Sequence, residues 1–346
     1  MLISINYKPC KGPYGGGNQF ASGFCEHFGK RHSVCFDLNS NKIDIILIID
    51  PRKVQNVRYT MQDVFNYQKN KNSNAIVVHR INECDERKKT KLMNLRLRIA
   101  NYLADHTIVL SNFLKTLNLF YNKKKNHITV IHNGQDPKIF KYNKNKNAIS
   151  SGAKIKLITH HWSPNYMKGH DIYQYLDTLI GTKNWRNKIE FTYIGNYPKN
   201  LKYNNTKFIK PLSGKKLATE LSKHDVHINA SINEPGGNSS GEGALCGLPL
   251  LIRNSGGITE TCDGYGVIFE DKKNFERKLK KLISNISFYK KKMHTYPYTM
   301  SYACEKYEKL FDYLIMNRQK YLHKRNNNHN WIMNILFKIG FFNLFL

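Results

Sequence analysis

The sequence predicts an α/β protein with two doubly wound, parallel-sheet domains, and three observations support this fold class. The chain has 346 residues, which is long for one hydrophobic core and comfortable for two domains. Short apolar runs recur along it, such as residues 43–49 (IDIILII) and 189–195 (IEFTYIG). The first predicted strand, residues 2–6, leads through a glycine-rich loop into a helix, which is the usual start of a mononucleotide-binding half.

The first domain is expected over residues 1–148. Its predicted strands are buried apolar runs, at residues 2–6, 43–49, 75–79, 107–110 and 127–132. Helices are predicted over residues 18–28 and 91–104. The loop at 8–17 (KPCKGPYGGG) contains glycines that allow a backbone to approach a ligand closely, and it is also compatible with a plain flexible loop.

His79 is the histidine of this domain with a predicted functional position. It ends the predicted strand at residues 75–79 (AIVVH), and parallel α/β sheets bind ligands at the carboxyl ends of their strands. A lone histidine is commonly structural, so spacing alone leaves both interpretations open. Asn82 follows in the same polar stretch after this strand.

The second domain is expected over residues 153–288, after a polar linker rich in Asn, Lys and Ser. Its predicted strands lie at residues 155–159, 189–195, 226–231 and 267–270. Its predicted helices lie at residues 170–179 and 214–221, and further helices follow over 273–292 and 302–320. Residues 289–325 therefore form a helical segment of their own, and 326–346 an apolar tail.

The most informative stretch of the chain is VHINASINEPGGNSSGEGALCGLPLLIRNSGGITE, residues 226–260. A strand is predicted to end in a turn over Glu234-Pro235-Gly236-Gly237-Asn238, and a helix to open at Gly241 after a serine N-cap. The loop and the first turn of such a helix point unpaired N–H groups at one spot, where the helix dipole also favours negative charge. A diphosphate is a suitable ligand for this place.

Two carboxylates bracket this loop. Glu234 precedes it, and Glu242 is expected inside the first helical turn. Carboxylates can accept hydrogen bonds from sugar hydroxyls but do not suit a phosphate, so amides would hold phosphates and carboxylates would hold hydroxyls on either side. A nucleotide diphospho-sugar requires this layout. The alternative is that Glu242 only complements the helix dipole and the glycines only form a turn.

The segment Glu234 to Glu242 resembles the E-x7-E element of retaining GT-B glycosyltransferases of the family 4 type. CGLPLLIRNSGGITE resembles the G-x-P-V…GG-x-x-E run that follows it in that family. The resemblance implies two Rossmann-like domains facing a cleft, with a C-terminal helix crossing back onto the first domain. It also implies metal-independent transfer with retention, with Glu234 beside the donor sugar and Glu242 on the ribose hydroxyls.

The resemblance extends to other segments. Residues 130–136 (VIHNGQD) are similar to the family's hinge, so Asn133 is expected on the acceptor side, together with Asn82. Family members place an Arg five residues before a Lys-Gly pair, and this chain has Ser163 five residues before Lys168. The residues expected to bind the donor are Gly15, Gly16, Gly17, Asn18, Ser163, Lys168, Gly236, Gly237, Asn238, Ser239 and Glu242. Catalysis is assigned to Glu234, with His79 near donor sugar and acceptor.

Composition limits the other function classes. The formal net charge is +30, which raises nucleic acid or an anionic membrane as partners. The lysines are dispersed among asparagines, and no zinc spacing or base-reading module is present, so no specific nucleic-acid partner is expected. Seven irregularly spaced cysteines indicate reduced thiols, and no signal peptide or spanning segment is evident. A cytoplasmic location is predicted.

The tail at residues 331–346 (WIMNILFKIGFFNLFL) is almost wholly apolar and follows the basic run HKRNNNHN. It is short for a membrane span, so two interpretations remain: an anchor lying in the membrane interface, or a helix docked on the body or in a dimer contact.

The sequence therefore predicts a glycosyltransferase that moves a sugar from a UDP- or GDP-sugar to a hydroxyl acceptor, which could be a glycan, a lipid or a protein. The nucleotide sugar is a substrate, and no cofactor or metal is expected. The alternatives are a sugar-nucleotide epimerase or hydrolase on the same fold, and a basic nucleic-acid-binding or scaffold protein on an inactive transferase fold. The Ser in place of Arg favours the last alternative, whereas the intact pair of glutamates argues against it.

Overall fold

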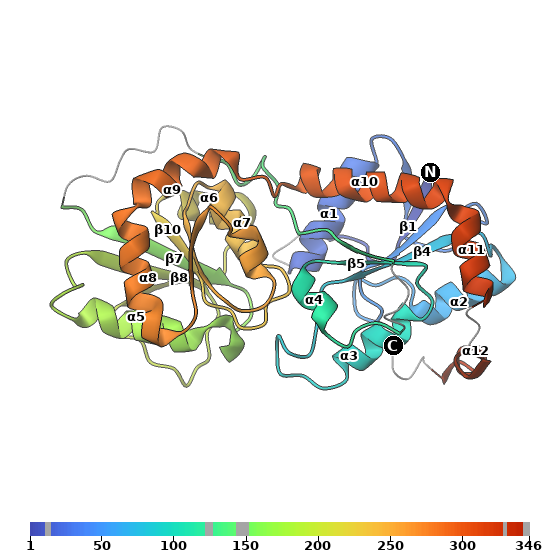
Figure 1. Ribbon diagram of the computed structural model, residues 1–346, viewed down its shortest axis with the longest axis horizontal. Coiled ribbons are helices and arrows are strands. Elements are labelled where there is room, and N and C mark those ends of the chain that lie inside the picture. The colour runs from blue at the N-terminus through green and yellow to red at the C-terminus, as the bar shows by residue number, and fades with distance from the viewer. Residues whose placement is uncertain (11–14, 122–126, 143–151, 328–330, 342–346) are drawn as a thin grey trace. The chain divides into compact units, whose positions relative to one another are not determined.

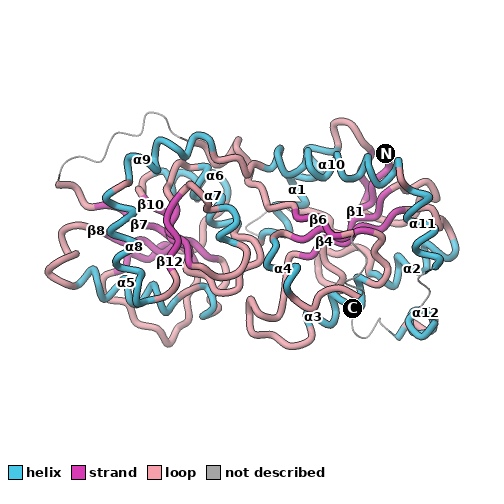
Figure 2. Tube along the Cα trace, viewed as in Figure 1, coloured by secondary structure: helices cyan, strands magenta, loops and turns pink. Residues whose placement is uncertain are grey.

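The computed structural model describes residues 1–10, 15–121, 127–142, 152–327 and 331–341 of the chain. Contacts within the chain divide it into two compact units. The first comprises Met1–Asp85, Lys89–His132 and Ser301–Leu346, and the second comprises Glu86–Lys88 and Asn133–Met300. Each unit has a parallel sheet covered by helices (Figures 1 and 2).

The first unit is built on a six-stranded parallel sheet in the order β2-β1-β3-β4-β5-β6. The strands are β1 (Leu2–Ile5), β2 (Ser33–Cys35), β3 (Ile45–Ile48), β4 (Ile76–Ile81), β5 (His106–Val109) and β6 (Ile128–Val130). All residues of β3, β4 and β5 are buried, as expected for parallel strands covered on both faces. The order reverses between β1 and β3, which makes their carboxyl ends a ligand-binding edge in folds of this kind.

Helices from both ends of the chain cover this sheet. They are α1 (Gly16–Phe28), α2 (Met61–Asn70), α3 (Met93–Asn101), α4 (Asn112–Thr116), α10 (Met300–Met316), α11 (Arg318–Asn327) and α12 (Trp331–Lys338). Helix α2 was not predicted, although Thr60 and Asp63 form a capping box at its start.

The last helices pack on the first unit through α1 and β4. The ring of Tyr307, in α10, lies 5.3 Å from that of Phe20, and its hydroxyl accepts a hydrogen bond from Arg80 Nε at 3.1 Å. The Arg80 guanidinium also stacks on Phe20 at 3.9 Å. Glu308 bonds to His32 Nε2 at 3.2 Å. The C-terminal helices thus complete the core of the first unit rather than form a separate layer.

The second unit is also built on a six-stranded parallel sheet, in the order β12-β11-β10-β7-β8-β9. Its strands are β7 (Ile155–His161), β8 (Ile189–Gly195), β9 (Thr206–Ile209), β10 (Val226–Asn229), β11 (Leu250–Arg253) and β12 (Gly266–Phe269). Its α-helices are α5 (His170–Gly181), α6 (Gly214–Ser222), α7 (Asn238–Leu245), α8 (Lys272–Ser284) and α9 (Ile286–Lys292). Short 3-10 turns, η1 (Tyr166–Lys168), η2 (Ile258–Thr261) and η3 (Met293–Thr295), complete it.

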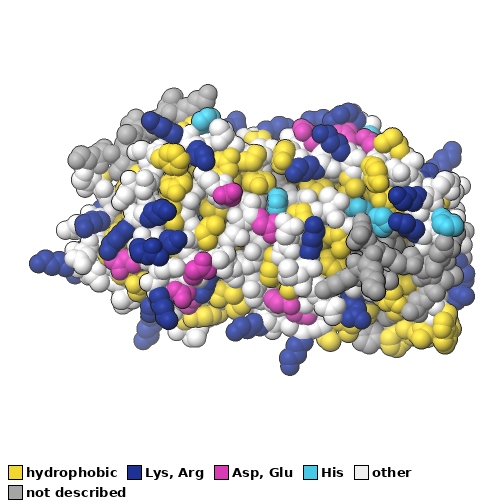
Figure 3. Space-filling view, in the orientation of Figure 1, with side chains coloured by type: hydrophobic (Ala, Val, Ile, Leu, Met, Phe, Trp, Pro, Cys, Tyr) yellow, Lys and Arg dark blue, Asp and Glu magenta, His cyan; other side chains and the backbone are white. Residues whose placement is uncertain are grey.

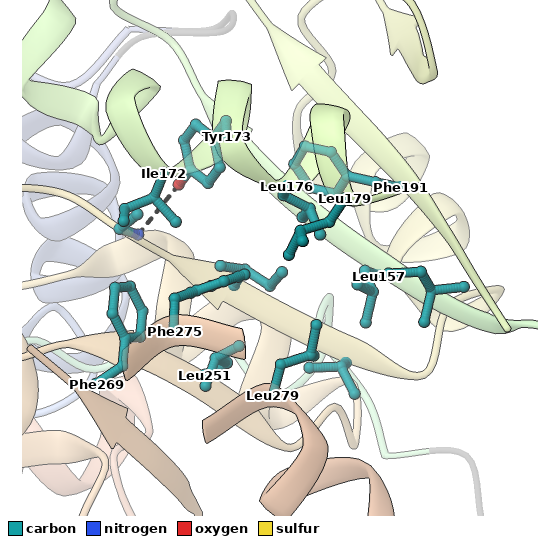
Figure 4. Packing of buried hydrophobic residues seen from close by; sticks show 14 of the residues in the cluster. Leu157, Ile172, Tyr173, Leu176, Leu179, Phe191, Leu251, Phe269, Phe275 and Leu279 are labelled. Atoms are coloured by element: carbon teal, nitrogen blue, oxygen red, sulfur yellow. Dashed lines mark hydrogen bonds between the residues drawn. The ribbon is translucent and has the colours of Figure 1, made fainter. Parts of the chain in front are cut away.

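The core on one face of this sheet lies between the strands and helices α5 and α8 (Figure 4). Tyr173 and Leu176 of α5 point at the strands, as do Phe275 and Leu279 of α8, and all four are fully buried. The Tyr173 hydroxyl accepts a hydrogen bond from the backbone N–H of Ala230 at 3.2 Å, just after β10. This packing fixes the start of α5 against the end of β10.

The structure corrects several predicted boundaries. β4 continues to Ile81, so His79 lies inside the strand and not at its end. α7 begins at Asn238 rather than at Gly241, so Glu242 lies in its second turn. The N-terminal part of the first unit ends at His132, before the predicted boundary at 148, and Gln135 already pairs with Thr299 within the second unit. Part of the linker, 143–151, lies outside the described residues.

None of the helices in the described ranges combines the length and the hydrophobicity that crossing a membrane demands.

Candidate active site

The candidate site of the second unit lies where the strand order reverses, between β7 and β10. Strands that leave such a point run to helices on opposite faces of the sheet, which opens a crevice at their carboxyl ends. After β7 the chain passes through η1 into α5, and after β10 it passes through the loop 230–237 into α7. The residues that the sequence singles out in this unit come from these two connections.

Glu234 is held between two cations. One carboxylate oxygen bonds Lys168 Nζ at 2.5 Å, and the other lies 3.1 Å from Arg87 Nε, in the segment Glu86–Lys88 that packs with the second unit. Glu234 is 7% exposed. Burial by itself would raise the pKa of this carboxyl, but Arg87 and Lys168 outweigh it and hold the pKa at about 2. Glu234 is therefore a buried carboxylate at neutral pH.

The backbone around Glu234 is fixed by the glycine pair that follows β11. Glu234 forms a parallel bridge with Gly256, and its carbonyl accepts from the N–H of Gly257 at 2.8 Å. Gly256 has φ +71°, and a Cβ there would lie 2.5 Å from the Glu234 carbonyl oxygen. Asn233 itself adopts φ 53°. The first glycine of the GG motif is needed because only glycine at position 256 lets these two segments approach so closely.

Lys168 is delivered by a second close approach. It ends η1 and is followed by Gly169, which has φ +96° and is the N-cap of α5. A Cβ at Gly169 would lie 2.3 Å from the carbonyl oxygen of Ala230, so this turn packs directly on the end of β10. The Lys-Gly pair therefore places a cation next to the loop that carries Glu234.

The amino terminus of α7 faces the same edge. Gly237 is its N-cap, and within the described chain no side chain caps it. Hydroxyls of the first turn are held by Asn229, whose Nδ2 donates to Ser239 Oγ at 3.1 Å and to Ser240 Oγ at 2.9 Å. Gly237 lacks room for a Cβ, which would lie 2.7 Å from Ile258. Such a helix end favours an anion, because its first N–H groups lack intrahelical partners.

Asn238 is oriented by the hinge segment. Its Oδ1 accepts from Asn133 Nδ2 at 2.7 Å and from Gln135 Nε2 at 3.2 Å. Gly236 precedes it, and the Gly236 carbonyl accepts from the Asn238 N–H at 3.1 Å. The structure thus brings Asn133, predicted as an acceptor-side residue, to the start of α7.

Glu242 takes part in a buried chain of three side chains. Its Oε2 lies 2.5 Å from His160 Nε2, and His160 Nδ1 lies 3.3 Å from His227 Nε2. Burial, followed by the neighbouring His160, lowers the pKa of His227 well below its ordinary value. Because His227 is then neutral, its Nε2 can donate a hydrogen bond to His160 Nδ1, and His160 Nε2 can donate one to Glu242. His160 thus fixes the carboxylate in the second turn of α7.

Arg87 and His160 are the site residues that sequence reasoning missed. Arg87 stands far from the motif in the chain, and nothing in its local pattern indicates a contact with Glu234. His160 and His161 lie side by side at the end of β7, and from the sequence alone such a pair fits packing as well as a site. His161 does pack: its Nε2 bonds the Tyr173 hydroxyl at 2.8 Å, and burial lowers its pKa well below the ordinary value.

Ser163 stands where the resembled family has arginine. Its hydroxyl accepts from the backbone N–H of Asn165 at 3.3 Å, and the side chain is partly buried. The serine thus shapes the turn before η1. Trp162, next to it, is 54% exposed.

The glycine-rich segment of the first unit lies after β1. Residues 11–14 of the predicted loop fall outside the described part of the chain. Gly15 caps α1, and Gly16 and Gly17 form its first turn, two residues before the predicted start. Among the described residues, a Cβ at Gly15 or Gly17 would meet nothing within 4 Å. Asn18 is buried and bonds both the N–H and the carbonyl of Cys10 at 2.9 Å, which closes the loop on itself.

His79 is fully buried in β4, and neither ring nitrogen has a hydrogen-bond partner among the described residues. Burial lowers its pKa to about 3, so the ring is neutral at physiological pH. Asn82 follows the end of β4 and is partly buried. The predicted roles of both residues, like those of the glycines of the first unit, remain predictions.

Across the described residues, no three His, Cys, Asp or Glu side chains converge in a way that could hold a metal ion.

Comparison with known proteins identifies the fold. No family model matches the chain, and no curated protein matches it by sequence. Among solved structures, HepE from Anabaena in complex with UDP matches with TM-score 0.67 at 14% identity, over 90% of this chain and 100% of that one. Sucrose-phosphate synthase from Thermosynechococcus elongatus matches with TM-score 0.64 at 12% identity, over 91% and 99%.

A glycosyltransferase from Rickettsia africae also matches, with TM-score 0.59 at 15% identity, over 91% of this chain and 98% of that one. Two six-stranded parallel sheets with flanking helices are the architecture of the GT-B glycosyltransferases. The chain has the GT-B fold, as the sequence predicted.

Proposed function

We propose that this chain is a glycosyltransferase that moves a sugar from a nucleotide diphospho-sugar to a hydroxyl acceptor, with retention of configuration and without a metal ion. The observation that carries the proposal is the ionised, buried Glu234 beside Lys168 and the start of α7, at the strand-order reversal of the second unit. Structures with the same fold support it, since HepE was crystallised with UDP and with UDP-glucose.

In this proposal the donor diphosphate binds at the amino terminus of α7 and to Lys168. The helix offers N–H groups and the positive end of its dipole, and the lysine offers a compact charge. Ser163 adds its N–H in place of the arginine of the resembled family. Gly236, Gly237 and Ser239 allow the phosphates to approach the backbone closely.

Glu242 accepts hydrogen bonds from the ribose hydroxyls. One oxygen of the Glu242 carboxylate, Oε2, lies 2.5 Å from His160 Nε2, and this contact fixes the orientation of the carboxylate. A fixed carboxylate suits recognition of a pair of vicinal hydroxyls. Pre-organisation of this kind limits the rotamer entropy that is lost when the ligand binds.

Glu234 acts on the sugar that is transferred. In the reaction the bond between the anomeric carbon and the diphosphate oxygen breaks, the acceptor oxygen bonds to the same face of that carbon, and the acceptor proton passes to the leaving diphosphate. Positive charge develops on the sugar ring, and a carboxylate that stays ionised stabilises it.

A thermal-shift screen against UDP, GDP, ADP and their sugar conjugates tests the proposal. We expect stabilisation by one nucleotide, and its loss in both Glu242→Ala and Glu242→Gln, of which the second keeps a hydrogen bond to His160. The matched control is Glu190→Ala, a half-exposed glutamate whose side chain lies on β8. No shift with any nucleotide would refute the proposal.

A donor-only incubation separates the related activities. Release of free sugar would indicate a hydrolase, and conversion to an isomeric sugar nucleotide would indicate an epimerase. Transfer requires an added acceptor, whether glycan, lipid or protein. The basic residues are spread over the visible surface of both units and are not gathered in one groove (Figure 3), which gives no support to a nucleic-acid partner.

A further inference from the structure

The C-terminal helix α12 presents two different faces. On one face Phe337 is fully buried, and its ring stacks on Phe65 at 5.3 Å and on Tyr102 at 6.0 Å. Gln62 Nε2 donates to the Phe337 carbonyl at 2.7 Å, and Met333 and Leu336 pack against the same cluster. This face docks the tail on the first unit, near α2 and α3.

The other face of α12 is apolar and exposed. Trp331 is 70% exposed, Ile335 is 44% and Ile339 is 68%. These three residues are four apart, so they lie along one side of the helix. Ile332 and Phe341 add to the exposed surface. Figure 3 shows hydrophobic side chains gathered at its lower right, where Figure 1 places α12.

Part of this face borders a cavity that lysines also line. Trp331, Ile335 and Lys338 line a cavity of about 770 Å³ in the first unit, together with Lys69 and Lys324. Among the described lining residues the acidic one is Asp105, which is paired with Arg325. The cavity therefore has net positive charge, with aromatic and aliphatic side chains next to it.

We propose that the exposed face of α12 and this cationic cavity form a docking surface for an anionic lipid bilayer. Tryptophan and aliphatic side chains on a short helix enter the boundary between headgroups and acyl chains, while lysines meet the anionic headgroups. The cavity is large enough to accept a headgroup, since ligand pockets span about 300–1,000 Å³.

The charges decide between a bilayer and a second copy of the chain. A symmetric dimer through this face would bring two copies of the same cationic patch, with Lys69, Lys324 and Lys338 in each, into one interface, and like charges repel. A bilayer rich in anionic lipid satisfies the cations and covers the apolar side chains at the same time. The docked face explains how the helix is held in place while its other face stays exposed.

Sedimentation of the full chain with vesicles tests this surface. We expect binding to phosphatidylcholine vesicles that contain phosphatidylglycerol, weak binding to pure phosphatidylcholine, and loss of binding at high salt. Lys69→Gln with Lys338→Gln should weaken binding about fivefold for each lysine removed. Trp331→Ser with Ile335→Ser should weaken it about tenfold or more.

The matched control is Met316→Ser, which removes an apolar side chain that is 78% exposed on α10 of the same unit. It should bind as the wild type does, and all variants should keep the same unfolding midpoint, because the altered side chains are exposed. Absence of binding to anionic vesicles, equal binding by the α12 variants, or equal binding to neutral vesicles would overturn the proposal. So would dimerisation of the wild type that the Trp331→Ser and Ile335→Ser changes abolish.

Discussion

Replacing Glu234 by Gln is the perturbation that probes the site most directly. The substitution keeps the shape of the side chain and removes its charge, so Lys168 and Arg87 lose the carboxylate that they share. Two cations that are 12% and 24% exposed would then face each other without a counter-charge. Removal of one partner of a buried ion pair typically costs 3–5 kcal/mol, and we expect the lower end because Arg87 keeps some contact with water.

The pKa of Glu234 gives a second route to the same magnitude. Its pKa lies at about 2 in the folded protein against the ordinary value of 4.5. Ionised Glu234 therefore stabilises the fold fully above pH 4.5, and this contribution is lost as the pH falls towards 2. A difference of this size corresponds to about 3 kcal/mol at neutral pH. The two estimates agree.

Urea unfolding of the wild type and Glu234→Gln at pH 7 and pH 3 measures this contribution. We expect the two proteins to differ by about 3 kcal/mol at pH 7 and by about 1 kcal/mol at pH 3, where the carboxyl of the unfolded wild-type chain is protonated while that of the folded protein is still mostly ionised. Titration calorimetry with the nucleotide found in the screen should give an affinity near that of the wild type, because Lys168 remains available to a diphosphate. Transfer should be abolished.

The reasoning would be wrong if the stability difference at pH 7 were below 1 kcal/mol or independent of pH. If nucleotide affinity and transfer fell equally, Glu234 would be a structural support and not a residue that acts on the transferred sugar.

Three further predictions follow from the contacts. Gly256→Ala should destabilise the fold by at least about 3 kcal/mol, because its Cβ would meet Glu234 and its φ is positive. Urea unfolding measures this cost. The control is Gly214→Ala, which has φ +55° and no described neighbour within 4 Å of the added Cβ, and which should cost about 1 kcal/mol. Lys168→Met should weaken binding of the selected nucleotide about tenfold or more in calorimetry, since a charge-assisted contact is lost. His79→Leu should be more stable than the wild type by about 2 kcal/mol at pH 5. The pKa of His79 is about 3 in the folded wild type and 6.5 in the unfolded chain, so the wild type loses stability as the pH falls below 6.5, whereas the leucine variant does not.

Each of these has a contradicting outcome. Equal costs for Gly256→Ala and Gly214→Ala would show that the close approach to Glu234 does not constrain the loop. Unchanged affinity in Lys168→Met would remove that lysine from the phosphate site. An unchanged rate of transfer in His79→Leu would remove His79 from catalysis, whereas a reduced rate at unchanged donor affinity would support the sequence prediction.

Local patterns predicted most of the strands, because buried parallel strands need continuous apolar runs and turns need glycine or proline, but β2 and β9 were not predicted. The runs IDIILII and IEFTYIG became β3 and β8. The boundaries failed where a polar residue stays inside a strand: His79 and Arg80 are both buried in β4, and Arg80 is accommodated only by Phe20 and Tyr307 from distant helices. A sequence pattern cannot show such partners.

Some residues of the candidate site could likewise be predicted from the sequence, and others could not. Spacing alone marked Glu234, Glu242 and the glycines, because carboxylates and flexible backbone leave a local signature. Arg87 lies 147 positions from Glu234, and His160 lies 82 positions from Glu242 and 67 from His227. No window of sequence contains such pairs.

By itself, therefore, the sequence determined the two-domain α/β class and most of the strands, and it marked the acidic and glycine residues of the candidate site. All of these depend on side-chain periodicity and backbone freedom. Tertiary structure alone decided that Glu234 stays ionised, that His160 orients Glu242, and that the tail buries one face and exposes the other. Charge state and exposure depend on which distant groups surround a side chain, and only the folded chain brings those groups together.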